Sequence, residues 1–345
     1  MENSKNIYIS KENALKNIEK IKKIIPNKKL CLMVKANAYG HGLENIVKIV
    51  DKYVDFFGVA NINEAIRIRK VSANNILIVG KTKCFKECLE SNVSLTIESL
   101  KQLENLVLFI KNNKTNKRIK IHFKVNTGMN RLGFNSVEEF VRGFEICEKH
   151  NIIVEGVFTH FSTLDCDNRY FVFQLNEFKK FLNVIPKRQN PTIHLGGSGI
   201  LNKEIDLDYS MARIGIAFYG YLNGIDVRPI LKIKSNIIKV FEVESGTRIG
   251  YGNGFIAKEK MKIGIVPLGY GDGISRNLSN FAFVKIKNKK FKIVGNVCMD
   301  MFFVDISGEM FAEGQEVVVF DDAKKWAQIL GTIPYEVLTN FSLVR

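Results

Sequence analysis

The sequence contains no apolar run long enough to cross a membrane. Its opening segment, MENSKNIYISKENALKNIEK, is charged throughout and lacks the apolar core that a secretory signal peptide requires. Both absences argue against export and against membrane insertion. We therefore expect a cytoplasmic protein with no membrane partner.

Cysteine is sparse, with six residues in a chain of 345. So few thiols do not form the dense disulfide framework of small secreted domains, and Cys84 and Cys88 lack the CxxC spacing of a metal-binding pair. The five histidines include no HExxH pair, a common zinc-binding pattern. We expect reduced thiols and no catalytic metal.

Low-complexity segments are missing as well, and the 46% hydrophobic and 25% charged residues are ordinary for a globular protein. The length accommodates one barrel-sized domain and a smaller one. A net charge of +16 attracts polyanions, but the lysines are scattered and no RNA-binding or zinc-finger motif accompanies them. We expect no nucleic-acid partner, and salt-dependent binding to DNA is the test of the alternative, a nucleic-acid-binding module.

Eight short runs of β-branched and aromatic residues alternate with segments whose apolar residues recur at helical intervals. This alternation is typical of parallel strands joined by crossover helices, and eight such units predict a (β/α)8 barrel of the TIM type. Such a barrel carries its chemistry at the carboxyl ends of its strands. The predicted strands are Leu30–Ala36, Phe56–Asn61, Ile76–Gly80, Ser94–Ile97, Lys120–Asn126, Ile153–His160, Thr192–Gly196 and Ala212–Tyr219.

After residue 225 the helical spacing stops, and β-type runs such as MKIGIVPLGY and MFFVDIS follow, separated by Gly, Asn and Asp turns. We therefore predict an α/β barrel over residues 11–225 and an all-β domain over residues 226–345. Two short helices, Ala323–Leu330 and Pro334–Phe341, close the chain. Within residues 1–10, Ile7–Ser10 is a candidate extra strand of the β domain.

Two nucleotide-binding patterns fail on spacing. IVGKTK resembles the end of a phosphate-binding P-loop, but Asn75 occupies the place of the glycine that opens such a loop. The segments GYGNG and GYGDG lack GxGxxG spacing and lie in the β region rather than at a strand-to-helix turn. A dinucleotide cofactor is therefore unsupported.

Lys35 is unusual because it lies inside the apolar run that opens VKANAYGHG. A lysine withdrawn from water has a lowered pKa, as a Schiff-base-forming amine requires. The alternative is a structural lysine at the barrel rim, with its amine in solvent. Groups from later strands favour a functional site, because we expect them to converge at one end of the barrel, where a hydroxyl and glycine amides would make an anion cradle. These groups are His160, His194, Ser198, Arg213 and the backbone of Gly215.

Eight segments are similar to motifs of the bacterial, pyridoxal-phosphate-dependent alanine racemase family, in the family's order and over nearly the whole chain. They are VKANAYGHG, KVNTGMNRLGF, FTHFS, HLGGSGI, MARIGIAFYG, IGYGNGF, PLGYGDG and VGNVCMDM. The resemblance implies an amino-terminal barrel, a carboxyl-terminal β domain and pyridoxal 5'-phosphate as cofactor. It also implies a homodimer that interconverts L-alanine and D-alanine and supplies D-alanine for peptidoglycan.

The resemblance implies how the cofactor is held. Lys35 carries it as a Schiff base, and Arg213 faces its pyridine nitrogen, where most pyridoxal enzymes place a carboxylate. Because a guanidinium stays protonated, the ring nitrogen stays unprotonated and the ring is a weaker electron sink. The other implied cofactor contacts are Tyr39, Ser198, Gly215 and Ile216 at the phosphate, His194 beneath the ring, and His160.

Inversion at a Cα requires a base on each face. The resemblance implies that Lys35 and Tyr251 are these bases, with His160 and Arg213 assisting the phenol. Tyr251 is implied to reach the active site of the partner subunit, which makes the dimer head-to-tail. The alternative for Tyr251 is packing within the β domain.

Substrate contacts follow from the same resemblance. Arg131 meets the cofactor phenolate and the substrate carboxylate, Met299 and Asp300 enter together with the second base, and Tyr270 lines the entry corridor. Lys124 matches a lysine that is often carbamylated to steady the arginine, and an unmodified structural lysine is the alternative.

Three positions depart from the family pattern. Asn126 replaces the usual Asp, Gly197 replaces the Asn before the phosphate-binding serine, and Ile214 replaces the Pro after the ring-facing arginine. The sequence ends at SLVR, residues 342–345, short of the family's longer ending, so we carry over no phosphate contact from that tail. These departures bear on fine geometry and substrate preference more than on reaction type.

Other functions on the same fold are kept as alternatives. A racemase for serine, lysine or several amino acids differs only in its pocket. Decarboxylases of basic amino acids need neither the Tyr251 base nor an arginine at the ring nitrogen. A non-catalytic pyridoxal-phosphate carrier is typically a lone barrel, and the predicted β domain argues against it.

Overall fold

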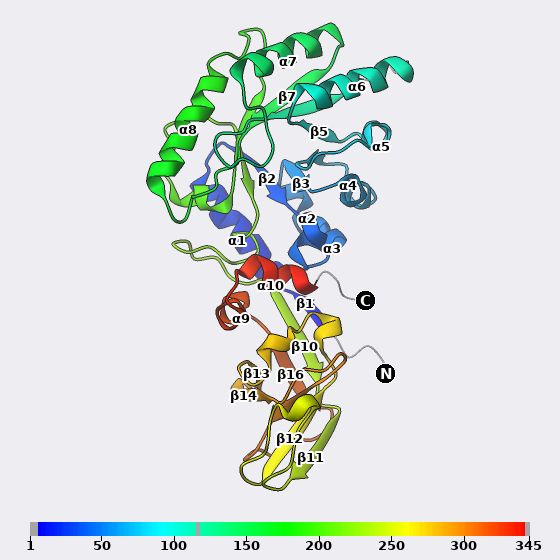
Figure 1. Ribbon diagram of the computed structural model, residues 1–345, viewed down its shortest axis with the longest axis vertical. Helices are drawn as coiled ribbons and strands as arrows, with labels where there is room; N and C mark the ends of the chain where they lie inside the picture. The colour runs from blue at the N-terminus through cyan, green and yellow to red at the C-terminus, as the bar shows by residue number, and fades with distance from the viewer. Residues whose placement is uncertain (1–5, 115–117, 342–345) are drawn as a thin grey trace.

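The structure is a computed structural model that describes residues 6–114 and 118–341. A barrel wrapped by helices forms one end of an elongated molecule, and an antiparallel sheet forms the other (Figure 1). The predicted architecture, an α/β barrel followed by an all-β region, is confirmed. The segment SLVR at residues 342–345 lies outside the described residues.

Eight parallel strands close the barrel in sequential order. They are β2 (Lys29–Met33), β3 (Phe56–Val59), β4 (Asn75–Ile78), β5 (Ser94–Ile97), β6 (Lys120–Lys124), β7 (Ile153–Phe158), β8 (Thr192–Gly196) and β9 (Met211–Ile214). The helices around it are α1 (Lys11–Ile24), α3 (Leu43–Val50), α4 (Ile62–Arg69), α5 (Phe85–Glu90), α6 (Leu100–Asn112), α7 (Val137–Lys149) and α8 (Asn168–Leu182).

Helix α7 illustrates how sequence fixes these elements. It begins at Ser136, whose hydroxyl accepts the backbone N–H of Glu139 at 3.2 Å and so satisfies a donor that the first turn leaves free. Its Phe140 and Phe144 pack on Phe123 of β6, with ring centroids 5.6 and 5.1 Å apart. Each buried aromatic side chain contributes roughly 1.5–3 kcal/mol. This packing anchors β6, the strand that carries Lys124.

The second region is one eight-stranded antiparallel sheet, in the order β1-β10-β16-β13-β14-β15-β12-β11. Its first strand, β1, comes from the start of the chain and pairs with β10, so that Ile7 faces Ile233 in register. The strands are β1 (Asn6–Ile9), β10 (Leu231–Asn236), β11 (Lys239–Val243), β12 (Met261–Val266), β13 (Phe283–Ile286), β14 (Lys289–Val294), β15 (Phe302–Asp305) and β16 (Glu316–Phe320).

Two helices, α9 (Ala323–Leu330) and α10 (Pro334–Asn340), follow the sheet and lead the chain back to the barrel mouth (Figure 1). Gly40, at the end of the first barrel loop, has a φ of +80°, and a Cβ there would lie 2.1 Å from the carbonyl oxygen of Leu338. Glycine therefore lets α10 contact the loop directly. This contact brings a late part of the chain to the carboxyl ends of the barrel strands.

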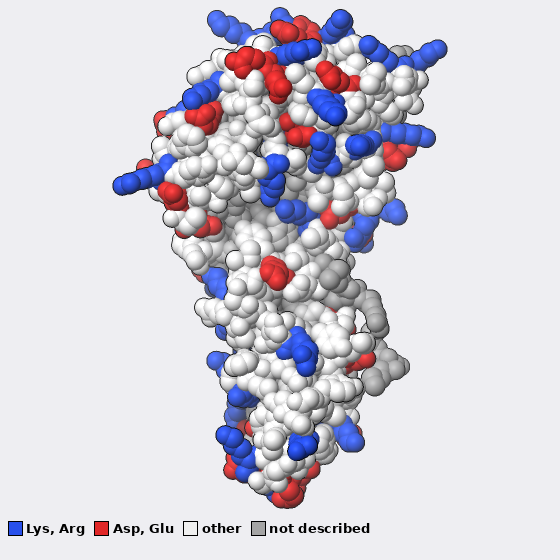
Figure 2. Space-filling model, in the orientation of Figure 1, with Lys and Arg blue, Asp and Glu red and all other residues white. Residues whose placement is uncertain are grey.

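Within the described part of the chain, no helix is both long and apolar enough to span a membrane. Over the same residues, no group of three or more His, Cys, Asp or Glu side chains is arranged to hold a metal ion. All six cysteines are free thiols. Basic and acidic side chains are interspersed over the face drawn in Figure 2, which shows no continuous basic patch.

Candidate active site

A cavity opens at the carboxyl ends of the barrel strands. Most of the residues predicted to bind cofactor or substrate line it: Lys35, Tyr39, Lys124, Arg131, His160, Ser198, Arg213, Gly215 and Ile216. His194 lies beneath the cavity, fully buried, and reaches it through Arg213. The structure therefore brings together the barrel residues that the motifs single out.

Lys35 lies outside the strand that was predicted to contain it. Strand β2 ends at Met33, and Lys35 opens a short turn, α2 (Lys35–Tyr39), in which Ala36 to Ala38 have φ values of 53° to 55°. This left-handed conformation costs about 1–2 kcal/mol per residue other than glycine. The prediction of a strand through Ala36 is wrong because the apolar run continues in sequence while the backbone changes hand.

The turn points the Lys35 side chain into the cavity, where it is accessible. Partial burial of Lys35 lowers the pKa of its amine, and the Arg131 guanidinium lowers this pKa further. Glu64 opposes this shift, and its two carboxylate oxygens accept the backbone N–H groups of Ala36 and Ala60 at 2.7 and 2.8 Å. The amine is thus less basic than a free lysine and faces open space.

An anion cradle lies opposite, between β8 and the end of β9. The Ser198 hydroxyl accepts the backbone N–H groups of Gly215 and Ala217, each at 3.1 Å. A Cβ at Gly215 would lie 2.5 Å from the Tyr39 hydroxyl, so glycine allows this hydroxyl to lie directly against the cradle backbone. Strand β9 ends at Ile214, five residues before the predicted end at Tyr219, because the chain turns here to form the cradle.

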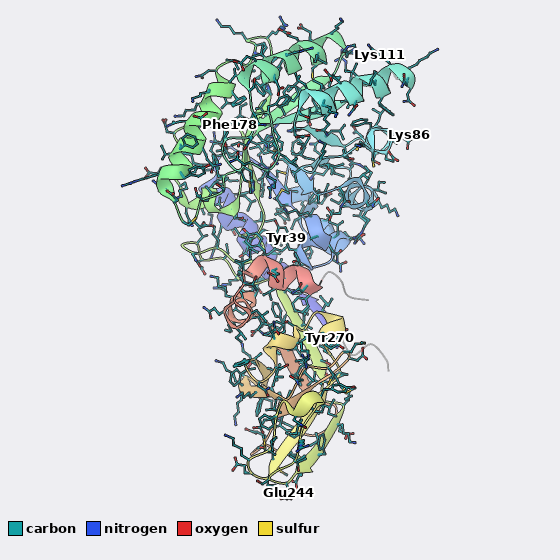
Figure 3. All side chains as sticks on the ribbon, viewed as in Figure 1. Tyr39, Lys86, Lys111, Phe178, Glu244 and Tyr270 are labelled. Atoms are coloured by element: carbon teal, nitrogen blue, oxygen red, sulfur yellow. The ribbon has the colours of Figure 1, made fainter. Side chains whose placement is uncertain are left out.

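Tyr335 also lines the cavity, and it was not predicted. It belongs to α10, and its ring centroid is 6.0 Å from that of Tyr39, the residue labelled at the barrel mouth in Figure 3. The sequence predicts the helix, but helical spacing does not reveal where a terminal helix docks. Tyr335 therefore supplies a hydroxyl-bearing side chain near the cradle, from the described end of the chain.

Arg213 is almost completely buried and held from several sides. Its Nη1 donates to Nδ1 of His194 at 2.7 Å, its Nη2 donates to the carbonyl oxygen of Thr159 at 2.7 Å, and its guanidinium lies 4.3 Å from the ring centre of Phe158. Burial lowers its pKa to about 10, so it remains cationic at neutral pH. Gly196 makes room, since a Cβ there would lie 2.0 Å from Nη2 of Arg213.

The histidines and Lys124 respond to this concentration of positive charge. Burial, followed by the charge of Arg213, lowers the pKa of His160 to about 3 and that of His194 well below its ordinary value. Burial and the guanidinium of Arg131 lower the pKa of Lys124 to about 8. Both histidines are therefore neutral near pH 7, and Lys124 loses its proton at a lower pH than an ordinary lysine.

Two departures from the family pattern have local structural reasons. The Asn126 side chain accepts the backbone N–H of Asn130 at 2.9 Å, and its amide group donates to Asn135 at 2.7 Å, which a carboxylate cannot do. Gly197 has a φ of +113°, and a Cβ there would lie 2.6 Å from Leu164. Ile214 is buried at the end of β9 and pairs with Leu32.

Four predicted residues lie away from the barrel cavity. Tyr251, Tyr270, Met299 and Asp300 line a separate surface groove on the second region, where Figure 3 labels Tyr270. The backbone N–H of Tyr270 donates to the carbonyl oxygen of Cys298 at 3.0 Å, which joins the two motifs. Tyr251 is 72% exposed. Within one chain, the structure does not bring this groove to Lys35.

Both regions of the chain are similar to known proteins. Residues 9–223 match the alanine racemase N-terminal domain, and residues 230–344 match the alanine racemase C-terminal domain. The chain belongs to the alanine racemase family. Members of this family are pyridoxal-phosphate-dependent isomerases.

Alanine racemase 2 of Caldanaerobacter subterraneus subsp. tengcongensis is 34% identical over 362 residues, covering 97% of this chain and 92% of the relative. The crystal structure of alanine racemase from E. faecalis superposes with a TM-score of 0.92 at 29% identity, over 99% of this chain and 97% of that one. Alanine racemase of Clostridium difficile 630 in complex with cycloserine superposes with a TM-score of 0.89 at 30% identity, over 99% of this chain and 94% of that one.

The family's cofactor fits the residues of this chain. The described residues that line the cavity include the cations Lys35, Lys124, Arg131 and Arg213, and no Asp or Glu. A cationic lining with hydroxyls and glycine backbone suits a phosphate. An alanine racemase from Bartonella henselae, which shares the fold at 23% identity and a TM-score of 0.89, was solved with covalently bound pyridoxal phosphate.

Proposed function

We propose that this chain interconverts L-alanine and D-alanine with Lys35 and Tyr251 as its two bases. The observation that carries the proposal is the combination, in one cavity, of an amine of lowered pKa, an anion cradle and a buried cationic arginine. An arginine in this place separates a racemase from the decarboxylases of similar architecture. The enzyme acts in the cytoplasm, and its product, D-alanine, is used to make peptidoglycan.

The barrel residues fix the orientation of the cofactor. Pyridoxal phosphate, when bound, supplies an aldehyde for bonding to amines and a ring that stabilises negative charge at Cα. Lys35 would bond to it, and Tyr39, Ser198, Gly215 and Ile216 would hold its phosphate. Arg213 would face its ring nitrogen, His160 would line the site, and the buried His194 would support Arg213 from beneath.

Proton transfer takes place on the two faces of the substrate Cα. The Lys35 amine takes or gives a proton on one face, and its lowered pKa makes it release its proton more readily than a free lysine does. The Tyr251 phenol serves the opposite face. Arg131 binds the substrate carboxylate, and it is steadied by Lys124 once that amine is carbamylated by carbon dioxide.

The second base comes from a partner subunit. Tyr251, Met299 and Asp300 lie on the surface groove of the second region, with Tyr270 beside them at the entry to the site. A head-to-tail homodimer places this groove over the barrel cavity of the other chain. In this assignment the surface groove of the β domain, residues 226–345, serves the partner's active site, whereas the barrel, residues 11–225, and Tyr335 of α10 serve the chain's own.

Racemisation by the purified protein tests the proposal. With pyridoxal phosphate and L-alanine, we expect D-alanine, measured by coupling to a D-amino-acid oxidase, and we expect none with Lys35→Ala. Lys81→Ala is the matched control, because Lys81 also follows a barrel strand but does not line the cavity. Bound cofactor without D-alanine would contradict the proposal and direct attention to serine and lysine as substrates, then to a carrier function.

A further inference from the structure

The barrel interior contains a continuous line of polar side chains that runs away from the cavity. Barrels of this class are commonly filled with branched aliphatic residues. Here, His194 of β8 contacts His122 of β6, with 2.8 Å between Nε2 and Nδ1, and His122 contacts Glu155 of β7, with 3.0 Å between Nε2 and the carboxylate. The line joins Arg213 at the cavity to Glu155 near the opposite end.

The chemistry of these groups fixes the position of every proton along the line. A guanidinium only donates, so Nδ1 of His194 accepts from Arg213 and the proton of this imidazole is on Nε2. That proton is donated to Nδ1 of His122, which therefore carries its own proton on Nε2 and donates it to Glu155. The Glu155 carboxylate can only accept, so it fixes the direction of all the hydrogen bonds in the line.

Charge and burial agree with two neutral imidazoles between an anion and a cation. Burial lowers the pKa of His122, and it lowers that of His194 more strongly. Burial opposes ionisation of Glu155, but hydrogen bonds from His122 and Ser94 hold its pKa at about 2. The ends of the line are therefore a carboxylate and the Arg213 guanidinium, both charged at neutral pH.

The backbone is shaped for this contact between the imidazoles. Gly156 follows Glu155, and a Cβ at Gly156 would lie 2.2 Å from Nδ1 of His122 and 3.0 Å from Nε2 of His194. Glycine is thus required where the two rings meet. Lys120 and the Ser94 hydroxyl both contact the Glu155 carboxylate and hold it in place.

We propose that Glu155 is a positioning residue, which acts through His122 and His194 to orient the Arg213 guanidinium toward the cofactor ring. Without a carboxylate at position 155, the reverse order of protons becomes available, and it places an N–H of His194 against the N–H groups of Arg213. The guanidinium then loses one of its hydrogen bonds. The inference rests on the proposed function only in assigning Arg213 to the cofactor.

Two measurements on the holoenzyme test this inference. In protein labelled with 15N-histidine, we expect His122 and His194 to be neutral and protonated on Nε2, and we expect Glu155→Gln to produce a mixture of tautomers. The same variant should lower kcat for racemisation about tenfold and leave KM within about twofold, because outer partners of this kind typically contribute that much and do not touch the substrate. The absorption spectrum of the bound cofactor should shift with kcat.

Asp55→Asn is the matched control, since Asp55 is a carboxylate near the same end of the barrel that accepts the backbone N–H of Leu30 at 2.8 Å. We expect it to leave the tautomers, the cofactor spectrum and kcat unchanged. Nδ1 protonation of either imidazole in the parent protein, or a Glu155→Gln variant indistinguishable from Asp55→Asn, overturns the inference. The tautomers of the parent are measured without reference to activity, so this result stands apart from any failure to form D-alanine.

Discussion

The carboxylate of Glu64 accepts the backbone N–H of Ala36 at 2.7 Å, and Ala36 directly follows Lys35, which lines the cavity. It also accepts the N–H of Ala60 at 2.8 Å, and so ties the left-handed turn of α2 to the end of β3. A turn of non-glycine residues in this conformation persists only when the surroundings hold it. Glu64 is thus a structural determinant of where the Lys35 amine lies.

Removal of this carboxylate should destabilise the fold and weaken cofactor binding. We expect Glu64→Ala to lower the free energy of unfolding by about 2 kcal/mol, because two backbone donors lose their acceptor. Glu64→Gln should have a smaller effect, since its amide oxygen still accepts one of them. Urea unfolding measures the change, and Glu87→Ala, at an exposed position in α5, is the control. Equal stability of Glu64→Ala and Glu87→Ala would refute this account.

The cradle should not tolerate a single added methyl group. In Gly215→Ala, the new Cβ would approach the buried Tyr39 hydroxyl to 2.5 Å, so the tyrosine or the strand end must shift. We expect the Kd for pyridoxal phosphate, measured by fluorescence titration, to rise at least about tenfold, equivalent to about 1.4 kcal/mol. Gly264→Ala, in β12 of the distant sheet, should leave this Kd unchanged. An unaltered Kd in Gly215→Ala would place the phosphate elsewhere.

Lys124 should make stability depend on pH in a defined window. Its pKa is about 8 in the folded protein and 10.5 ordinarily, so between these values the unfolded chain binds more protons and the free energy of unfolding rises with pH. Below pH 8 the buried charge destabilises the fold by roughly 3 kcal/mol. In buffer free of carbon dioxide, Lys124→Met should remove this dependence and be the more stable protein at pH 7.5.

Denaturant unfolding at pH 7.5 and pH 10 provides the comparison, with Lys86→Met as an exposed control. The gain from Lys124→Met should shrink as the pH rises, whereas Lys86→Met should show no such trend. A gain that is the same at both pH values would mean that Lys124 is not held with a lowered pKa.

Mixing two inactive variants tests whether the second base comes from a partner. Lys35→Ala and Tyr251→Ala damage different halves of a shared site, so a mixed dimer holds one intact site and one doubly damaged site. After unfolding and refolding an equal mixture, we expect about a quarter of the parent activity, since about half of the dimers are mixed. Activity no greater than the sum of the two variants would show that each site is built within one chain.

The sequence predicts the barrel well because strand and helix periodicity are local properties. It fails at the carboxyl ends of the first and last barrel strands for a physical reason. The run ending in Ala36 reads as a strand, and nothing in its composition indicates a left-handed turn of alanines and an asparagine. Similarly, Ala212–Tyr219 is apolar apart from Arg213, yet the strand stops at Ile214, where the chain turns to form the anion cradle.

The sequence predicts the site residues that belong to motifs. It misses those that reach the site only through packing between distant segments. Tyr335 reaches the cavity only because α10 docks beside Gly40, a contact between distant segments. The Glu155 line was detectable in principle. In β6, alternation places Lys120, His122 and Lys124 on one face, and three polar side chains on the inner face of a barrel strand indicate a buried polar network.

The pairing of β1 with β10 has a consequence for how the chain is made on the ribosome. The edge strand, Asn6–Ile9, is synthesised before the barrel, but its partner, Leu231–Asn236, is synthesised only after the entire barrel. Contacts between such distant segments form late, because the intervening chain must first be ordered. This edge strand therefore stays unpaired throughout barrel synthesis and joins the sheet as one of the last steps of folding.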